Sequence, residues 1–366
     1  MALQCGIIGL PNVGKSTLFN ALTESGIPAE NYPFCTIEPH IGIVELPDDR
    51  LKILGNIYNP QKITPATVEF IDIAGLVKGA SRGEGLGNQF LGQIRQTSAI
   101  LHVVRCFDSK NITHVDGSVD PIRDIETIET ELLLSDIETL ERRKIKSKKL
   151  SKSGNKESKK SSELLDLLIE QCSNGIAARN VKVEKDELYF KKSLQLLTEK
   201  PVIYIANTDE SEIMKDKYNN YVNSLIKYAT KQKNIVIRLC GTLEQEIACL
   251  NKDEKLVFLK EYNLNEAGLN KVIKSSFQLL GLENFFTCGE TEVRSWTIPK
   301  GTSAPEAAGI IHSDFQRGFI KADTFHYSDI VKNGSEKILR DLGLIRQEGK
   351  NYIVKDGDCI FFKFNV

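Results

Sequence analysis

The residues best suited to chemistry lie near the start of the chain, in the run Gly9-Leu10-Pro11-Asn12-Val13-Gly14-Lys15-Ser16. An apolar stretch from Leu3 to Ile8 precedes this run, and a helical pattern from Thr17 to Leu22 follows it. A G-x-x-x-x-G-K-S spacing between a strand and a helix lets backbone N–H groups surround phosphates at the positive end of the helix. We expect Lys15 to reach the β- and γ-phosphates of a nucleotide and Ser16 to bind Mg²⁺. The alternative is a glycine turn with an incidental Lys-Ser pair.

A second motif, Asp72-Ile73-Ala74-Gly75, follows an apolar strand pattern from Ala66 to Ile71. In phosphate-loop enzymes, Asp-x-x-Gly at such a strand end supplies a carboxylate on the Mg²⁺ side and a glycine N–H that meets the γ-phosphate. The motif is weak alone, but its position after a phosphate loop strengthens it. We therefore expect Asp72 to be a Mg²⁺ ligand and Gly75 to contact the nucleotide.

Two further stretches have the composition of nucleotide-dependent switches. Gly26 to Pro39 contains three prolines and no helical period, so we expect an extended loop from which Thr36 completes the Mg²⁺ ligands. Lys78 to Gln93 is dense in glycine and should be mobile until a γ-phosphate orders it.

Cys35 lies in the first of these loops and is a candidate thiol sensor. The remaining cysteines show no C-x-x-C pair and should be reduced and mostly buried.

The composition excludes several classes of protein. The chain has 366 residues, 41% of them hydrophobic, which suffices for two or three domains. Its 48 Lys and Arg nearly balance its 49 Asp and Glu, so net charge favours neither nucleic acid nor membrane binding. No apolar run approaches the roughly 18 residues of a membrane span, and no basic leader is present. We expect a cytoplasmic protein with no membrane partner and no DNA partner.

The hydrophobic patterns divide the chain into three parts. Strand patterns, of which Ala99 to Cys106 and Pro201 to Ala206 are examples, predict a nucleotide-binding domain made of residues 1–124 and 199–281. Helical spacing predicts a coiled-coil insert over 125–198, and short strands around one helix predict a small α+β domain over 282–366. The expected fold class is α/β: a P-loop NTPase with a mixed, mostly parallel sheet flanked by helices, a helical coiled-coil insert and a small α+β domain.

A basic, serine-rich stretch from Arg142 to Lys160 lies within the expected insert. We interpret it as the exposed turn of a helical hairpin. Such a turn is either a solvated tip or a surface that contacts RNA phosphates.

With these motifs, the chain resembles the YchF-type, Obg-related ATPases, known in eukaryotes as Obg-like ATPases. The resemblance covers nearly the full length, and besides the two phosphate motifs it rests on the segments Asn31 to Pro39, Leu101 to Phe107, Asn207-x-x-Glu210, Arg294 to Pro299 and Asp314 to Ile320. It implies a GTPase-like domain split by a helical insert, followed by a C-terminal TGS domain of β-grasp shape. It also implies a nucleotide-hydrolysing switch that associates with ribosomes. The resemblance does not distinguish between binding to the large subunit and binding to the 70S particle.

The base-binding motif departs from that of guanine-specific switches. Those proteins use Asn-Lys-x-Asp, in which the Asp accepts two N–H donors of guanine and the Lys packs on the base. Here Thr208 replaces the Lys and Glu210 replaces the Asp, whereas Asn207 can still contact a purine. We therefore expect ATP to be preferred over GTP.

The residue that positions the attacking water does not stand at its usual place in the motif. Leu76 stands where Ras-like switches have a glutamine, and it cannot hydrogen-bond. The resemblance implies that His114 takes this role beside Lys15, although a single loop histidine is more often simply exposed.

The residues expected to contact the nucleotide are Asn12, Val13, Gly14, Lys15, Ser16, Thr17, Gly75, Asn207, Glu210 and Cys240, and the expected Mg²⁺ ligands are Ser16, Thr36 and Asp72. The alternatives are a GTPase, or a nucleotide-gated ribosome- or protein-binding module with incidental hydrolysis.

Overall fold

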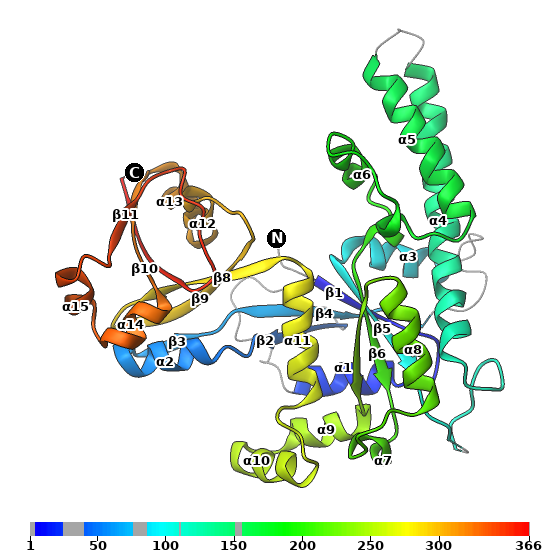
Figure 1. Ribbon diagram of the computed structural model, residues 1–366, viewed down its shortest axis with the longest axis horizontal. Coiled ribbons are helices and arrows are strands. Elements are labelled where there is room, and N and C mark those ends of the chain that lie inside the picture. Colours follow the sequence, from blue (N-terminus) through cyan, green and yellow to red (C-terminus); the bar gives the residue numbers. More distant parts are fainter. Residues whose placement is uncertain (1–3, 25–39, 76–85, 110, 151–155, 366) are drawn as a thin grey trace. The chain divides into compact units, whose positions relative to one another are not determined.

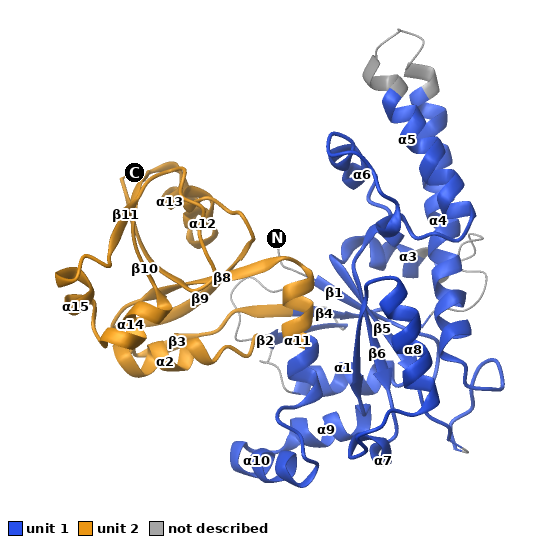
Figure 2. Cartoon of the chain, in the orientation of Figure 1, with its two compact units in different colours: residues 1–44, 69–272 blue, residues 45–68, 273–366 orange. Residues whose placement is uncertain are grey.

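A computed structural model describes residues 4–24, 40–75, 86–109, 111–150 and 156–365 of the chain. The chain forms two compact units, one of residues 1–44 and 69–272 and the other of residues 45–68 and 273–366 (Figure 2). Thr36, Cys35 and Leu76 lie outside the described residues, as does the first half of the glycine-rich stretch. The second half of that stretch, expected to be mobile, forms the beginning of helix α3 (Leu86–Gln96).

The first unit is built on a six-stranded sheet with the order β2-β4-β1-β5-β6-β7 (Figure 1). Its neighbours β4 and β1, β1 and β5, β5 and β6, and β6 and β7 are parallel, as the sequence predicts. Every residue of β5 and β6 is buried, which explains their uninterrupted apolar runs. The strands are β1 (Gln4–Ile8), β2 (Ile41–Glu45), β4 (Thr67–Asp72), β5 (Ala99–Arg105), β6 (Val202–Asn207) and β7 (Ile235–Leu239).

Helices flank this sheet and start from loops at its carboxyl edge. Helix α1 (Lys15–Glu24) follows β1 and packs against α9 (Gly241–Cys249), which follows β7. Helix α8 (Asn220–Lys231) packs against β6 and β7. Other helices of this unit are α6 (Leu188–Ser193), α7 (Glu210–Ile213) and α10 (Lys252–Glu261), and the boundary between the two units falls within α11 (Gly268–Leu279). Parallel strands bring the loops before α1, α7 and α9 to one edge, where such sheets bind ligands.

The predicted insert is a helical hairpin of α4 (Pro121–Leu150) and α5 (Lys156–Ser173), whose contact is visible in Figure 1. Its core contains leucines from both helices: Leu133, Leu140, Leu164, Leu165 and Leu168. The prediction that Arg142 to Lys160 is a turn was too wide. Helix α4 continues to Leu150 and α5 resumes at Lys156, because lysine and arginine favour helix nearly as well as leucine.

Buried polar contacts attach the hairpin to the segment that leads back to the sheet. The Asp136 carboxylate of α4 accepts hydrogen bonds from the backbone N–H groups of Leu197 and Thr198, at 2.7 and 2.8 Å. Asp136 is only 1% exposed, so these bonds replace water completely. Residues 125–198 therefore share one compact unit with the sheet, and α4 already begins at Pro121.

The second unit extends the expected C-terminal domain with residues from the first part of the chain. Its six-stranded sheet has the order β11-β10-β12-β8-β9-β3, where β3 (Lys62–Thr64) pairs parallel with β9 (Glu292–Pro299). Leu51 and Leu54 of α2 (Asp49–Tyr58) pack in a core with Phe286. The other elements are β8 (Leu282–Cys288), α12 (Ala304–Ile311), α13 (Ser313–Arg317), β10 (Phe319–His326), α14 (Tyr327–Asn333), α15 (Glu336–Asp341), β11 (Arg346–Glu348) and β12 (Asp358–Phe364). The boundary at residue 282 thus differs from that of the compact unit, which begins at 273 and includes 45–68.

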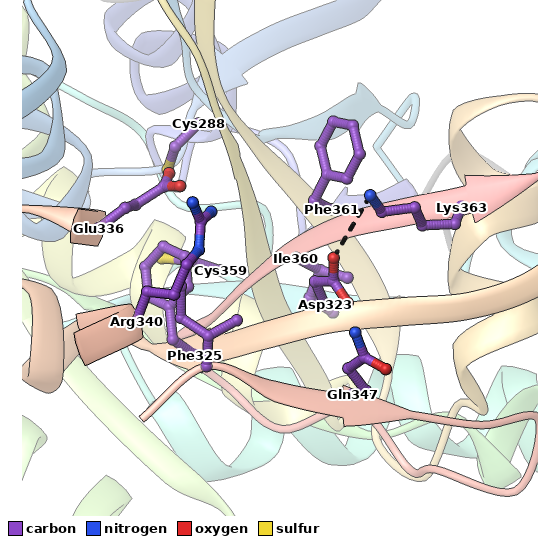
Figure 3. A pocket seen from close by; sticks show the side chains of 11 residues that line it. Cys288, Asp323, Phe325, Glu336, Arg340, Gln347, Cys359, Ile360, Phe361 and Lys363 are labelled. Atoms are coloured by element: carbon purple, nitrogen blue, oxygen red, sulfur yellow. Dashed lines mark ion pairs between the residues drawn. The ribbon is translucent and has the colours of Figure 1, made fainter. Parts of the chain in front are cut away.

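The second unit also contains a cavity of about 490 Å³ on one face of its sheet (Figure 3). Phe325, Cys359 and Phe361 of the sheet line it together with Glu336 and Arg340 of α15. The cavity mixes acidic, basic and aromatic groups, and Asp323 is paired with Lys363 at 3.6 Å. This mixture does not select one class of ligand.

The cysteines of the described residues agree with the expectation of reduced, mostly buried thiols. All seven cysteines in the described parts of the chain are free thiols, and five of them are buried; Cys249 is exposed and Cys288 is half-buried. None of the helices in those parts is long and apolar enough to cross a bilayer.

Candidate nucleotide-binding and hydrolysis site

The phosphate loop adopts the strand–loop–helix arrangement that its sequence predicts. Strand β1 is buried up to Ile8, and α1 begins directly at Lys15. Gly14 has a φ of +92°, a region that favours glycine, and a Cβ at this position would lie 2.2 Å from the Asn207 amide nitrogen. Asn12 also has a positive φ, of 63°. The loop therefore needs glycine at position 14 both for its backbone conformation and for the approach of a second motif.

Lys15 and Asp72, the two charged residues of the predicted phosphate site, form an ion pair. The contact follows from the sheet, because β1 and β4 are parallel neighbours and Ile7 is in register with Asp72. Their side chains are 11% and 16% exposed, so both are mostly buried but reach solvent. Ser16, the next residue of α1, is exposed at the same helix start.

These residues fit a magnesium ion. A serine hydroxyl and a carboxylate are the hard oxygen donors that Mg²⁺ prefers; Ser16 follows Lys15 in the chain, and Asp72 is the ion-pair partner of Lys15. Gly75 also lies near the loop, since a Cβ on Gly75 would be 3.6 Å from the Gly9 carbonyl oxygen. Thr36 belongs to a segment outside the described chain, so its place beside these residues stays a prediction.

Asn207 joins the phosphate loop to the start of α9. Its side-chain Nδ2 donates to the Val13 carbonyl at 2.8 Å, and its Oδ1 accepts from the Gly241 N–H at 2.9 Å. Asn207 is 6% exposed, so both bonds are made away from bulk water. We expected Asn207 to contact the base; the structure adds a bracing role, and the second Nδ2 hydrogen remains for a purine acceptor.

The side chains at the two substituted positions of the base-binding motif form hydrogen bonds with other groups of the protein. Thr208 is 2% exposed and its hydroxyl donates to the Leu239 carbonyl at 3.1 Å, so it presents no group for packing on a base. Glu210 is the first residue of α7 and accepts a hydrogen bond from the Tyr262 hydroxyl. This bond to Glu210 raises the pKa of Tyr262 to about 12. Cys240 is buried at the start of α9.

The structure corrects the view of His114 as an ordinary loop histidine. The residue is 6% exposed, and both ring nitrogens have partners: Nδ1 accepts from the Asp116 N–H at 3.1 Å, and Nε2 lies 2.9 Å from Asp124 Oδ2. Its loop nevertheless adjoins the phosphate loop, because Asn12 Nδ2 donates to the Thr113 carbonyl at 3.2 Å. The loop of His114 is therefore next to the phosphate loop, but both ring nitrogens of His114 already have hydrogen-bond partners.

Sequence reasoning missed three residues that hold the site. Arg105 is 1% exposed and donates to the carbonyls of Phe107 and Ile112, both at 3.1 Å, which supports the loop before His114. Tyr262 lies far from Glu210 in the sequence, so no local pattern could reveal their contact. Asp124 could have been noticed as an acidic residue in the first turn of a helix, but such residues usually stabilise only the helix.

Comparisons with known proteins place this geometry in a family. A family model described as a 50S ribosome-binding GTPase matches residues 4–136, and one described as a protein of unknown function, the C-terminal domain of YchF GTPases, matches residues 282–365. The chain is 52% identical to the ribosome-binding ATPase YchF of Bacillus subtilis and 49% identical to that of Escherichia coli O157:H7, each over 366 residues and the whole of both chains. The chain belongs to the YchF family. The solved structure of the Schizosaccharomyces pombe YchF GTPase is 38% identical, with a TM-score of 0.90 over 99% of this chain and 97% of that one.

The Asn207 brace generates a prediction. Asn207→Ala removes the bonds to Val13 and Gly241, worth together about 2 kcal/mol, so we expect nucleotide affinity to fall by up to about thirtyfold because the loop loses its fixed shape before binding. Calorimetric titration with Mg²⁺-ATP measures the loss. Mg²⁺-tripolyphosphate, which lacks a base, should lose affinity as well if Asn207 acts through the phosphate loop. Asn223→Ala, an exposed change on α8, is the matched control, and unchanged tripolyphosphate binding in Asn207→Ala would contradict the brace.

Proposed function

We propose that this chain is a ribosome-binding ATPase that hydrolyses ATP to ADP and phosphate and acts as a nucleotide-dependent switch. The observation that carries the proposal is the full-length similarity, at 52% and 49% identity, to relatives named ribosome-binding ATPases. The structure supports it, because Lys15, Asp72 and Asn207 meet at one sheet edge. Since ribosomes work in the cytoplasm, we expect the protein there.

ATP rather than GTP is the proposed substrate because the guanine-reading groups are missing. Glu210 is engaged by Tyr262, and Thr208 points into the protein toward the Leu239 carbonyl. Guanine would bring two N–H donors without their usual bidentate acceptor, and desolvated donors without partners cost affinity. The GTPase reading stays as the alternative, since the solved relative from Schizosaccharomyces pombe is titled a GTPase.

The chain's own residues account for phosphate binding. Backbone N–H groups of the phosphate loop and the start of α1 face the phosphates, and Lys15 exchanges its Asp72 partner for the β- and γ-phosphate oxygens. Ser16 and Asp72 would hold Mg²⁺, with Thr36 proposed as a further ligand. When bound, the ion neutralises charge on the phosphates. Asn207 keeps the loop and α9 together while the nucleotide binds.

His114 is proposed to orient the attacking water. Leu76 has no polar group for this task, and the loop of His114 touches the phosphate loop through Asn12 and Thr113. A ring nitrogen that accepts a hydrogen bond from water needs a free lone pair, and the described arrangement uses both nitrogens. His114 must therefore give up one of its two contacts before water is positioned.

The basic end of the hairpin is proposed as part of the ribosome contact. Some of its charges are already balanced, because Lys144 pairs with Asp166 and Lys160 pairs with Asp186. Arg143 and Lys146 are exposed on α4 and have no ion-pair partner among the described residues. Unpaired cations on a narrow helical end release counterions when they meet RNA phosphates. The solvated-tip interpretation is the competing one.

We also propose a functional division into three parts, with residues 1–124 and 199–281 binding the nucleotide, 125–198 forming the insert and 282–366 forming a TGS domain. The division follows chemistry rather than compactness, since the hairpin and the sheet share one compact unit.

Nucleotide preference is tested by equilibrium titration of the full chain with ATP and GTP in the presence of Mg²⁺. We expect ATP to bind at least about tenfold more tightly, which corresponds to roughly one buried hydrogen bond. Lys15→Ala should weaken both nucleotides severely, because it removes the positive charge that faces the phosphates. Tighter binding of GTP would support the alternative reading, and unchanged ATP affinity in Lys15→Ala would contradict the whole site.

Replacing His114 separates binding from chemistry. In His114→Ala we expect the single-turnover rate of ATP hydrolysis to fall by about tenfold or more, with nearly unchanged ATP affinity, because the ring acts in the transition state. Rapid-quench kinetics at saturating ATP give the rate. His102→Ala is not a suitable control because His102 is buried in β5; His312→Ala, on the second unit, is exposed and should leave the rate unaltered. Weaker ATP binding with a normal rate would show that His114 only supports the pocket.

The ribosome contact is tested by charge neutralisation. Changing Lys146, Lys148 and Lys149 to Gln should weaken ribosome association and lower its salt dependence by a log–log slope of about one to two. Co-sedimentation over a range of salt concentrations measures both quantities. The matched control changes Lys227, Lys231 and Lys233, three exposed lysines in and just after α8. Equal salt slopes for wild type and the α4 variant would leave only the solvated-tip interpretation.

A further inference from the structure

The contact between His114 and Asp124 is more constrained than a surface ion pair. Their side chains are each 3% exposed, and Nε2 of His114 lies 2.9 Å from Oδ2 of Asp124. The two residues come from different elements, since His114 lies in the loop after β5 and Asp124 in the first turn of α4. Burial of both groups makes this contact worth more than an exposed pair and costly to break on one side only.

The hydrogen bonds around the ring assign its proton. The Asp116 N–H points at Nδ1 over 3.1 Å, and a backbone N–H is only a donor, so Nδ1 offers a lone pair. Asp124 presents carboxylate oxygens, which are acceptors, so Nε2 carries the proton and donates it. A neutral His114 is thereby held in the Nε2–H tautomer.

Arg123 fixes the orientation of Asp124. Its Nη2 and Nε donate to Asp124 Oδ1 at 3.0 and 3.3 Å, and its Nη2 also donates to the Ser118 carbonyl at 2.6 Å. One carboxylate oxygen is thus committed to Arg123 and the other to His114. The guanidinium also places one positive charge near both Asp124 and Asp116.

We propose that Asp124 is the positioning residue of His114: it keeps the proton on Nε2, so that Nδ1 is the nitrogen that accepts a hydrogen bond from the attacking water. This inference rests on the proposed role of His114. Of the two contacts of the ring, the one to the Asp116 amide is a neutral hydrogen bond within a turn, whereas the one to Asp124 is assisted by charge and about twice as strong. The Asp116 contact therefore breaks first and frees Nδ1, while Nε2 stays on Asp124.

The tautomer can be observed in the unmodified protein. Long-range ¹H–¹⁵N spectra of the full chain labelled at histidine nitrogens distinguish a protonated ring nitrogen from one with a lone pair, and His114→Gln identifies the signal of His114. We expect a protonated Nε2 and an unprotonated Nδ1. The opposite tautomer, or rapid exchange between the two, would overturn the proposal without reference to any variant of Asp124.

Asp124→Asn tests the consequence for catalysis. Arg123 is a donor and will hold the amide oxygen, so the amide NH₂ will face Nε2 and force the proton onto Nδ1. We expect swapped ¹⁵N signals and a single-turnover rate lowered by about tenfold or more, with ATP affinity within about twofold of wild type. Asp120→Asn is the matched control, because Asp120 caps α4 through the N–H of Ile122 and Asn caps helices equally well. Swapped signals with an unaltered rate would overturn the proposal.

A double-mutant cycle separates this inference from the role of His114 itself. If Asp124 acts through His114, Asp124→Asn should cause no further loss of rate in the His114→Ala background. An equal loss in both backgrounds would overturn the proposal. A normal rate in His114→Ala would instead reject the proposed role of His114, whereas a slow His114→Ala together with a normal Asp124→Asn would reject only the positioning role.

Discussion

The close approach of Asn207 to Gly14 is the constraint on which the nucleotide site depends. Because Gly14 has no Cβ and a positive φ, the Asn207 amide reaches the Val13 carbonyl and binds the Gly241 N–H with its oxygen. One buried side chain thereby fixes the loop after β1 relative to the start of α9. The parallel strands β1, β5 and β6 set the distance between these parts, so the core of the sheet and the shape of the phosphate loop are coupled.

Charge at the site is balanced inside the protein. Lys15 and Asp72 neutralise each other in a mostly buried pair, so neither leaves an uncompensated charge. In the proposed complex, a nucleotide with its metal ion would replace both contacts, since the lysine would gain phosphate oxygens and the carboxylate would gain a cation. Glu210, in the motif expected to bind the base, also has a partner within the protein, because its carboxylate accepts a hydrogen bond from the neutral hydroxyl of Tyr262.

The loop with His114 is held from three directions. Arg105 binds its carbonyls, Asn12 connects it to the phosphate loop, and Asp124 connects it to α4. Helix α4 has 30 residues, a length of about 45 Å, and its far end carries the basic residues of the hairpin. The same rigid element thus contacts both the loop of His114 and the surface proposed to meet the ribosome.

The sequence by itself determined the local chemistry and most of the first unit. The G-x-x-x-x-G-K-S spacing, the apolar runs of β5 and β6 and the helical period of α4 are local signals, and they predict the phosphate loop, the mostly parallel sheet and the hairpin. Family resemblance added the base motif and His114. Local patterns suffice here because strand burial and helix periodicity depend on neighbouring residues only.

Only the tertiary structure decided which groups are free to act. The sequence could not show that α2 and β3 join the second unit, because a three-residue strand has no detectable alternation and its partner β9 lies far along the chain. Nor could it show that Tyr262 hydrogen-bonds to Glu210, or that Asp124 hydrogen-bonds to Nε2 of His114, since both contacts arise from packing between separate elements. Residue types and spacing specify which chemistry is available, whereas hydrogen-bond partners and burial, which are long-range properties, determine which nitrogen or oxygen performs it.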